Sequence, residues 1–257
     1  MQGWEAFGSG GYGDRIADVY DELYPEVPTS GPVESTVAFL ASLAGSGPAL
    51  ELGIGTGRVA IPLQAAGVEV HGIDASERMV ARLRAKPGGD RIPVTIGDFV
   101  ELSLAERFAV VYVPFNTFFG LLSQDDQIAC MRSVARHLTP EGAFVIEAFV
   151  PDPSRFDHGQ RVSAIRVEPD LVALEITKHD PVEQRSYSQH VLIREDGIHL
   201  WPVQIRYAFV AELDLMARRA GLRVRERWAD WDRTPFSSDS PKHISVYELD
   251  PETAGSS

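Results

Sequence analysis

Three carboxylates in the first half of the chain each lie in or directly after a short apolar run. Glu51 lies in the first run, Asp74 follows Val68–Ile73, and Asp98 follows Ile92–Ile96. Short apolar runs bounded by turn residues predict buried strands, and the carboxyl ends of neighbouring parallel strands meet at one edge of a sheet. We therefore expect the three acids to line a single crevice that binds hydroxyl, amine or cationic groups.

A glycine-rich turn follows the first of these strands, because the segment Glu51–Arg58 has the sequence ELGIGTGR. Glycine lets a backbone turn sharply and approach a ligand closely, although this spacing alone can also be a simple tight turn. A nicotinamide dinucleotide would use Asp74 for its ribose, but its fingerprint has a third glycine where Arg58 stands. Glu51 would also repel a pyrophosphate, whereas an acidic edge favours a cationic amino group beside a sulfonium.

The composition indicates a soluble protein with a sizeable core. The chain has 257 residues, 44% of them hydrophobic, and its 24 Lys and Arg against 37 Asp and Glu give a net charge of −13. This balance argues against nucleic-acid partners, and no apolar run approaches the roughly 20 residues of a membrane helix. Met1–Gly13 is glycine-rich and polar where a signal peptide would be apolar. The single cysteine, Cys130, excludes an intrachain disulfide, so we expect a cytoplasmic protein without a metal.

Short strands that alternate with helix-period segments predict an α/β chain with a mostly parallel sheet covered by helices. The expected strands are Pro48–Leu52, Val68–Ile73, Ile92–Ile96, Phe108–Val113, Gly142–Phe149, Leu222–Trp228 and Ile244–Leu249. The expected helices are Arg15–Tyr24, Pro32–Leu43, Ser76–Ala85, Gln124–Leu138 and Ala211–Ala220. Turn signals at 168–170, 179–181 and 195–197 divide Arg161–Arg206 into antiparallel hairpins.

These elements predict one core with an insertion. We expect an N-terminal helical cap at 1–45, a core at 46–150 and 207–250, an antiparallel β insertion at 151–206, and a disordered tail at 251–257. The insertion follows the fifth strand, so it emerges at the carboxyl edge of the sheet, above the expected crevice. There it would wall a substrate pocket or form a dimer interface.

With these motifs the chain resembles the class I S-adenosylmethionine-dependent methyltransferases. Glu51–Gly57 is similar to their first motif, Val70–Asp74 to their ribose-binding strand end, Gly97–Phe99 to their adenine-contacting turn, and His137–Gly142 to their turn into strand five. The resemblance covers residues 16–150 and, more loosely, 206–249. It implies a Rossmann-like seven-stranded sheet with the last strand antiparallel, and S-adenosylmethionine as cofactor, which becomes S-adenosylhomocysteine.

The resemblance also implies the cofactor contacts. The glycine loop would lie against the methionine part, Asp74 would hold both ribose hydroxyls, and Asp98 would take the adenine amine, with Phe99 offering an aromatic face. Tyr24 of an N-terminal helix would close over the cofactor, and Arg58 would pair with its carboxylate. The expected cofactor-binding residues are Tyr24, Glu51, Gly53, Gly55, Gly57, Arg58, Asp74, Ala75, Met79, Asp98, Phe99, Pro114, Phe115 and Asn116.

The end of the fourth strand, Val113–Phe119, is where the methyl group and its acceptor would meet. It lacks the Asn/Asp/Ser-Pro-Pro-aromatic run expected of enzymes that methylate a flipped base, so a small-molecule acceptor of the natural-product or sugar kind is favoured. The expected substrate contacts are Phe118, Phe119, Trp231 and Phe236. For the two phenylalanines, packing at the sheet edge explains the sequence equally well.

Methyl transfer from a sulfonium to an O, N or C atom is an in-line displacement in which positioning supplies much of the rate. A base is needed where the acceptor must lose a proton, and the candidates are His243, His158 and Tyr12, although a structural role is favoured for any single histidine. Two alternatives stay open: an S-adenosylmethionine-binding enzyme that does not methylate, such as a cyclase, and a nicotinamide-dependent oxidoreductase. A homodimer is a further expectation.

Overall fold

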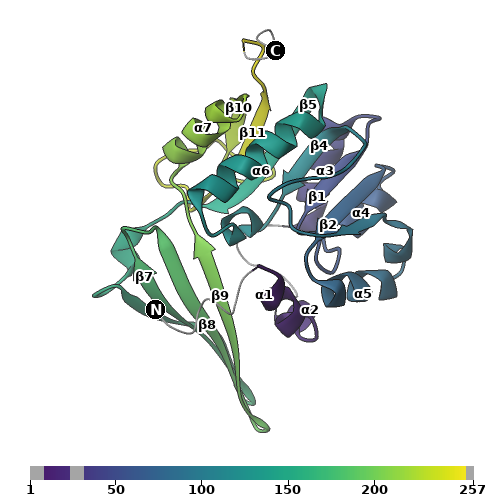
Figure 1. Cartoon of the computed structure of the whole chain (residues 1–257). Coiled ribbons are helices and arrows are strands. Elements are labelled where there is room, and N and C mark those ends of the chain that lie inside the picture. Colours follow the sequence, from purple (N-terminus) through teal and green to yellow (C-terminus); the bar gives the residue numbers. More distant parts are fainter. Residues whose placement is uncertain (1–8, 24–31, 253–257) are drawn as a thin grey trace.

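The computed structural model describes residues 9–23 and 32–252 (Figure 1). The strands of its larger sheet are β1 (Ala49–Leu52), β2 (Val70–Asp74), β3 (Val94–Ile96), β4 (Phe108–Val113), β5 (Leu138–Phe149), β10 (Leu222–Trp228) and β11 (Lys242–Leu249). The helices beside it are α3 (Val33–Ala44), α4 (Ala60–Ala65), α5 (Glu77–Ala85), α6 (Gln124–His137) and α7 (Val210–Arg219).

A second sheet and several short helices complete the fold. The second sheet has the strands β6 (Gln160–Glu168), β7 (Leu171–Asp180), β8 (Arg185–Arg194) and β9 (Gly197–Arg206). The short helices are α1 (Ser9–Ile16), α2 (Tyr20–Leu23) and the single 3₁₀ turns η1 (Gly89–Arg91), η2 (Thr117–Gly120) and η3 (Pro153–Arg155). Within the described residues, no helix is both long enough and apolar enough to cross a membrane.

The larger sheet has the strand order β10-β11-β5-β4-β1-β2-β3. Strands β1 to β5 run parallel, and β11 is antiparallel to both β5 and β10. This confirms the predicted fold, mostly parallel with the last strand reversed. The chain order switches between β1 and β4, and open α/β sheets bind their ligands beyond the carboxyl ends of the strands at such a switch point.

Apolar layers on both faces of the larger sheet fix the strand ends in place. Alternate residues of β4 point to opposite faces, so Val111 and Val113 belong to the layer that includes α6 and α7, while Val110 and Tyr112 belong to the layer with α3 and α4. All four side chains are at most 1% exposed. Strands buried on both faces appear in the sequence as continuous apolar runs, which is why β1 and β4 were predictable.

The second sheet extends away from the larger one beside α1 and α2 (Figure 1). Its hairpin register pairs Thr177 with Ser188 and His179 with Ser186, which places these side chains on one face, the inner face. The first and third connections fall at the predicted turn signals 168–170 and 195–197, but the second is formed by residues 181–184, so His179 and Asp180 of the predicted signal 179–181 belong to β7. Elsewhere on the inner face, Leu171, Ala173 and Leu192 pack with Trp201, which also contacts α1.

The N-terminal helical segment differs from its expected bounds. The predicted helix Arg15–Tyr24 is replaced by α1 and α2, with a turn at 17–19. Helix α1 begins earlier than expected because it packs directly on α5: a Cβ at Gly13 would lie 2.7 Å from Ser76 Cβ. Only glycine allows this approach, so tertiary packing outweighs the low helix propensity of the glycines.

Candidate functional site

The loop after β1 contains three glycines with positive φ, of 69° at Gly53, 55° at Gly55 and 80° at Gly57. A Cβ at Gly53 would lie 2.5 Å from Thr117 Cγ2, and one at Gly57 would lie 3.0 Å from Ile61 Cδ1. Among the described residues, a Cβ at Gly55 would approach no atom closer than a backbone oxygen at 3.9 Å. Packing therefore requires Gly53 and Gly57, whereas Gly55 faces open space that a ligand can fill.

Asp74, the last residue of β2, ties this loop to the strand end. Its Oδ2 accepts a hydrogen bond from Gly55 N at 2.7 Å, and its Oδ1 accepts one from Ser76 N at 2.8 Å. Burial raises the pKa of the Asp74 carboxyl, and the two backbone donors oppose that rise. Each carboxylate oxygen can accept more than one hydrogen bond, so Asp74 can also receive hydroxyl groups of a ligand.

Glu51 lies deeper than its sequence position suggested. Glu51 is only 3% exposed, and its Oε2 accepts a hydrogen bond from the Tyr112 hydroxyl at 2.8 Å. Burial raises the pKa of Glu51 to about 8, while Tyr112 and the nearby Arg58 guanidinium oppose the rise. The expected charged acid in an open crevice is therefore corrected to a buried carboxyl that is mostly protonated at pH 7.

Asp98 and Phe99 follow β3 beside the glycine loop. Asp98 is exposed, and its Oδ1 accepts a hydrogen bond from Val100 N at 2.8 Å. Phe99 Cε1 would lie 3.7 Å from a Cβ at Gly53, and Phe99 is only 8% exposed. The end of β3 therefore does lie next to the loop, but the core covers most of the Phe99 ring.

Residues after Asp74 connect the strand end to α5. Ala75 is half-buried, and Ser76 caps the helix by accepting a hydrogen bond from Met79 N at 3.1 Å. Met79 is 4% exposed and packs with Ile16 beneath α1. The helix cap expected from the sequence is thus present, and the Met79 side chain is part of the apolar cluster under α1.

The short helices α1 and α2 are anchored to the glycine loop and to the start of α5. Asp14 accepts a hydrogen bond from Ser76 Oγ at 2.6 Å, and Asp21 accepts one from Thr56 Oγ1 at 2.7 Å. Both acids come from helices far away in the sequence. The N-terminal helices therefore cover the same edge of the sheet that the glycine loop occupies.

Tyr20 of α2 is a site residue that sequence reasoning did not select. Its side chain is half-buried, and burial raises the pKa of its hydroxyl. The charges of Arg58, Glu51 and Asp74 all act on this hydroxyl, so Tyr20 lies over the ends of β1 and β2. The sequence favoured Tyr24 for this position, and Tyr24 lies outside the described residues. Two tyrosines four residues apart gave no signal for choosing between them.

The turn Pro114–Asn116 at the end of β4 has a strained backbone. Phe115 and Asn116 have φ values of 55° and 61°, in the left-handed region that non-glycine residues rarely adopt. Glu147 at the end of β5 holds this turn, because its Oε2 accepts from Phe115 N at 2.8 Å and its backbone oxygen accepts from Asn116 N at 3.1 Å. Asn116 Oδ1 in turn accepts from Phe149 N at 2.7 Å. Such strain is typical of functional sites.

Replacing Asn116 should separate backbone strain from hydrogen bonding. We expect Asn116→Ala to lower the free energy of unfolding by about 2 kcal/mol, since it loses a hydrogen bond and keeps a strained φ. Asn116→Gly should lose only about 1 kcal/mol, because glycine adopts positive φ without strain. Urea unfolding of both variants checks this, and equal losses would show that the strain is absent.

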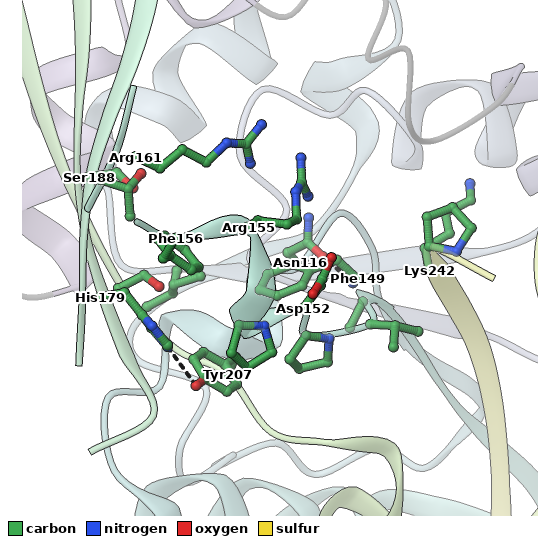
Figure 2. Close-up of a pocket in the computed structure, with 18 of the residues that line it drawn as sticks. Asn116, Phe149, Asp152, Arg155, Phe156, Arg161, His179, Ser188, Tyr207 and Lys242 are labelled. Carbon is green, nitrogen blue, oxygen red and sulfur yellow. Dashed lines mark hydrogen bonds between the residues drawn. The ribbon is translucent and has the colours of Figure 1, made fainter. Parts of the chain in front are cut away.

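A cavity of about 530 Å³ lies between this turn and the inner face of the second sheet (Figure 2). Side chains from the end of β5, the 150–156 connection, β6 to β9 and the start of β11 line it. The polar and aromatic lining residues include Asn116, Glu147, Asp152, Arg155, Phe156, Arg161, Glu175, His179, Tyr207, Asp230 and Lys242. Because Asn116 belongs to both the strained turn and the cavity wall, the cavity begins at the carboxyl end of β4.

Glu147 and Lys242 form a charged wall where the cavity meets the strand ends. Glu147 is 3% exposed, and burial raises the pKa of its carboxyl against the influence of Lys242. Lys242 Nζ lies 3.5 Å from Glu147 Oε1 and 2.8 Å from Asp230 Oδ1. This wall was missed because Glu147 sits inside an otherwise apolar strand and Lys242 precedes the predicted start of β11.

His179 and Tyr207 form a second polar pair in the cavity. His179 Nε2 lies 2.7 Å from the Tyr207 hydroxyl, and the His179 ring stacks on Phe156 at a centroid distance of 4.4 Å (Figure 2). Burial lowers the pKa of His179, so the imidazole is neutral near pH 7. The sequence showed His179 only as part of a turn signal, and nothing there indicated that its hairpin would face the strained turn.

The four expected substrate contacts do not line the cavity. Phe118 and Phe119 are fully buried, with ring centroids 6.4 Å and 5.2 Å from those of Phe144 and Phe149, so they are core residues. Trp231 is 3% exposed and packs edge-on against Phe39 at 5.5 Å. Phe236 lies 6.3 Å from the His243 ring, outside the cavity wall. An aromatic side chain near a sheet edge is explained by packing as readily as by ligand contact, and here packing applies.

The three expected bases are also placed elsewhere. His243 is 0% exposed within β11, and burial lowers its pKa to about 3, so it stays neutral and out of reach of a ligand. His158 lies in the exposed connection before β6, where its Nε2 is 3.6 Å from Asp157. Tyr12 packs with Ile16 in the cluster under α1. Their sequence positions gave no information about the direction of these side chains.

The strand ends fit the cofactor that the motifs imply. Asp74 offers carboxylate oxygens beside the open face of Gly55. At the neighbouring strand, Glu51 offers a carboxyl group and Arg58 offers a guanidinium. The Arg58 guanidinium carbon lies 4.8 Å from the Phe115 ring centroid, which connects the glycine loop to the strained turn. The end of β1 therefore provides donors and acceptors for an α-amino acid group, and the end of β2 provides acceptors for hydroxyls.

The chain is similar in sequence to known methyltransferases. The family described as "Methyltransferase domain" matches residues 49–142. The cypemycin N-terminal methyltransferase of a Streptomyces species is 30% identical over 202 residues, spanning 77% of this chain and 82% of that protein. A dTDP-4-amino-2,3,4,6-tetradeoxy-D-glucose N,N-dimethyltransferase of Saccharopolyspora spinosa is 28% identical, spanning 68% and 70%.

A solved structure extends the similarity to nearly the whole chain. The CcbJ methyltransferase from Streptomyces caelestis superposes with a TM-score of 0.86 and 44% identity, covering 93% of this chain and 97% of that one. The chain uses S-adenosylmethionine, the donor of the methyl group, as its cofactor. It belongs to the class I S-adenosylmethionine-dependent methyltransferases.

Proposed function

We propose that the methylated atom is an amine nitrogen of a natural-product acceptor held in the 530 Å³ cavity. The observation that carries this proposal is the neutral His179 in a cavity that also reaches Glu147, because a protonated amine must lose a proton before its lone pair can attack. The name of the amino-sugar relative specifies transfer to nitrogen, and the name of the cypemycin relative specifies methylation at an N-terminus, which supports the proposal.

In this proposal, residues at neighbouring strand ends bind different parts of the cofactor. S-adenosylmethionine supplies an electrophilic methyl group on a sulfonium when bound. Asp74 accepts hydrogen bonds from ribose hydroxyls, Asp98 accepts from the adenine amine, and Glu51 with Arg58 holds the amino acid end. Tyr20 covers the same strand ends, and its aromatic face is suited to a neighbouring cation.

The insertion at 151–206 provides the wall of the acceptor site in this proposal, and the strained turn at Phe115 and Asn116 orients the acceptor against the strand ends. His179 accepts the proton of an ammonium acceptor, with Tyr207 fixing the imidazole ring.

The helical cap at 1–45 closes the cofactor side, and the core at 46–150 and 207–250 carries the strand ends. The tail at 251–257 has no role here, and a cytoplasmic setting fits these assignments.

Replacing His179 should affect the acceptor and leave the cofactor. We expect His179→Gln to lower kcat/KM for the acceptor about tenfold at pH 7, since water in the open cavity can partly replace the base. Its affinity for S-adenosylhomocysteine should equal that of the wild type. Tyr207→Phe, which keeps the ring, is the matched control for orientation. Loss of S-adenosylhomocysteine binding in His179→Gln would contradict the division between the two sites.

The acceptor atom can be tested with matched compounds. The protein is incubated with S-adenosylmethionine and a panel of amino sugars and peptides with free N-termini, together with alcohols of the same skeletons. Mass spectrometry records which compounds gain one CH2 unit per methyl added. We expect methylation of amines only, and methylation confined to the alcohols would overturn the nitrogen assignment.

The outer face of the second sheet supports a homodimer. Side chains opposite to the cavity include Val162, Val167, Ile176, Ile193, Ile198 and Leu200, which are 66%, 71%, 42%, 38%, 67% and 56% exposed. Together they expose on the order of 500 Å² of apolar surface, as large as the largest apolar patches on monomers and somewhat more than half of the roughly 800 Å² that each partner buries in a standard interface. A flat apolar sheet face can pair with its own copy about a two-fold axis.

Light scattering behind a sizing column tests this dimer. We expect twice the chain mass for the wild type, and the chain mass for Ile176→Lys combined with Leu200→Lys, because two buried lysines per protomer lose their hydration. Leu215→Lys on α7, also exposed at 61%, is the control outside this face. A monomeric wild type would end the dimer proposal.

A further inference from the structure

Two arginines of the insertion lie in the cavity without a charged partner. Arg155 ends η3 and Arg161 is the second residue of β6, and both line the cavity. Within the described part of the chain, neither guanidinium makes a hydrogen bond or an ion pair. Figure 2 shows both guanidinium groups on the side of the cavity away from the His179–Tyr207 pair.

The acids near these arginines already have other partners. Glu175 lies close enough to both arginines for their charges to lower its pKa, but its largest partner is His190, whose Nε2 is 3.5 Å from Glu175 Oε1. Asp152 accepts hydrogen bonds from the backbone and side chain of Ser154. Neither acid forms a salt bridge with a guanidinium, so both arginines keep their donors available.

The third cation of the cavity behaves differently. Lys242 is 2.8 Å from Asp230 and 3.5 Å from Glu147, so its charge is compensated within the protein. Arg155 and Arg161 thus form the part of the cavity with excess positive charge, in a chain whose net charge is −13. Such a chain repels anions in general, and an anionic compound that enters this cavity needs a local cationic group to hold it.

We propose that Arg155 and Arg161 bind a carboxylate or phosphate group of the methyl acceptor. This inference rests on the proposed amine acceptor and assigns that acceptor a second, anionic group. A guanidinium presents a planar fork of donors that matches a carboxylate or phosphate in a bidentate manner. Arg58, on the glycine loop beside Glu51, serves the cofactor's single carboxylate, so the insertion arginines serve the other substrate.

The arrangement orders the acceptor along the cavity. The anionic group lies at Arg155 and Arg161, and the amine lies between His179, which takes its proton, and Asn116 at the end of β4, where the methyl group is transferred. An acceptor with only one of these groups is bound at one end and can rotate about that contact. An acceptor with both groups is bound at both ends, so its amine is kept near the methyl group, and we expect the protein to methylate such a compound in preference to one with a single group.

Binding of simple anions tests the subsite directly. Inorganic phosphate and acetate are titrated by calorimetry into the protein loaded with S-adenosylhomocysteine, using the wild type, the double variant Arg155→Gln with Arg161→Gln, and Arg132→Gln. Arg132 is an exposed residue of α6 outside the cavity and serves as the matched control. We expect the double variant to bind the preferred anion at least tenfold more weakly and the control to bind it as the wild type does.

Each outcome of the titration decides the inference. Stronger binding of phosphate points to a phosphorylated acceptor, and stronger binding of acetate points to a carboxylate acceptor; both support the subsite. Absence of binding to the wild type, or equal binding by all three proteins, would overturn it. S-adenosylhomocysteine affinity is measured for each variant, and it should not change, because neither arginine belongs to the cofactor contacts.

Turnover separates this inference from the nitrogen assignment. Amines that carry an acid are compared with their neutral amides or alcohols, and we expect a kcat/KM ratio of at least ten in favour of the acid for the wild type and near one for the double variant. Equal turnover of both forms would refute the anion subsite while leaving the amine acceptor intact. Failure of every amine would refute the proposed function, and the phosphate and acetate titrations would still judge the subsite.

Discussion

Replacement of Asp74 by alanine is expected to weaken S-adenosylhomocysteine binding roughly 100-fold. The Asp74 carboxylate accepts hydrogen bonds from two ribose hydroxyls in this assignment, so the alanine variant loses two charge-assisted hydrogen bonds to the ligand. A combined loss of about 3 kcal/mol in binding free energy corresponds to a roughly 100-fold weaker affinity. Isothermal titration calorimetry measures it. The variant also removes the acceptor for Gly55 N and Ser76 N, but Gly55 faces open space where water can replace the bond, so the fold is retained.

Asp74→Asn is the matched control for this effect. It keeps one acceptor oxygen and nearly the same volume, so we expect a loss of about tenfold, between those of the wild type and the alanine variant. Circular dichroism and thermal unfolding establish that both variants are folded. Unchanged affinity in a folded Asp74→Ala protein would refute the ribose assignment and leave Asp74 as a residue that only shapes the glycine loop.

Replacement of Glu51 by glutamine is expected to stabilise the ligand-free protein at neutral pH. The folded pKa of Glu51 is about 8 against an ordinary value of 4.5, so the folded protein binds one more proton than the unfolded chain between these values. Stability therefore falls as pH rises from about 4.5 to about 8. At pH 7 the cost is on the order of 3 kcal/mol, since each pKa unit corresponds to about 1.4 kcal/mol.

Glutamine has no proton to lose and can still accept the Tyr112 hydrogen bond. The difference in unfolding free energy between Glu51→Gln and the wild type should be near zero at pH 4 and grow toward pH 8. Urea unfolding across this pH range measures it, with Glu106→Gln, an exposed acid, as control. A difference that does not depend on pH would show that Glu51 keeps an ordinary pKa in the folded chain.

The same carboxyl should couple cofactor binding to pH. A cationic amino group against Glu51 favours the ionised acid, so binding releases a proton, and affinity rises with pH until the pKa of the free carboxyl is passed. Calorimetry in buffers of different ionisation enthalpy counts this proton for the wild type. Glu51→Gln should release no proton from this position and should bind S-adenosylhomocysteine more weakly. Its greater stability would therefore come at the expense of cofactor affinity.

Much of the core was predictable from the chain because its signals are local. The strands β1 and β4 are apolar runs with clear turn boundaries, and the cap of α5 is a serine before a helix-period segment. The reversal of the last strand was implied by the family resemblance. The bounds of α1 were not predictable, because its packing on Ser76 depends on residues far apart in the sequence.

The glycine loop and Asp74 were also identified from the sequence, since a strand, three glycines and an acid at the next strand end form one motif. Their spacing forces them to one edge of a parallel sheet. Glu51 was found at the right strand but with the wrong ionisation, because its depth depends on the layers above and below β1. Charge counted along the sequence carries no information about dielectric surroundings.

The sequence by itself determined the class of fold and the acids at the strand ends, because periodicity and motif spacing are local properties, and the family resemblance implied the cofactor. Tertiary structure alone decided which side chains line the cavity. His179, Glu147 and the arginine pair come from elements distant in the chain, and they meet only because the insertion folds back over the end of β4. Phe118, Phe119 and His243 were excluded for the same reason: burial is set by neighbours that the sequence does not place.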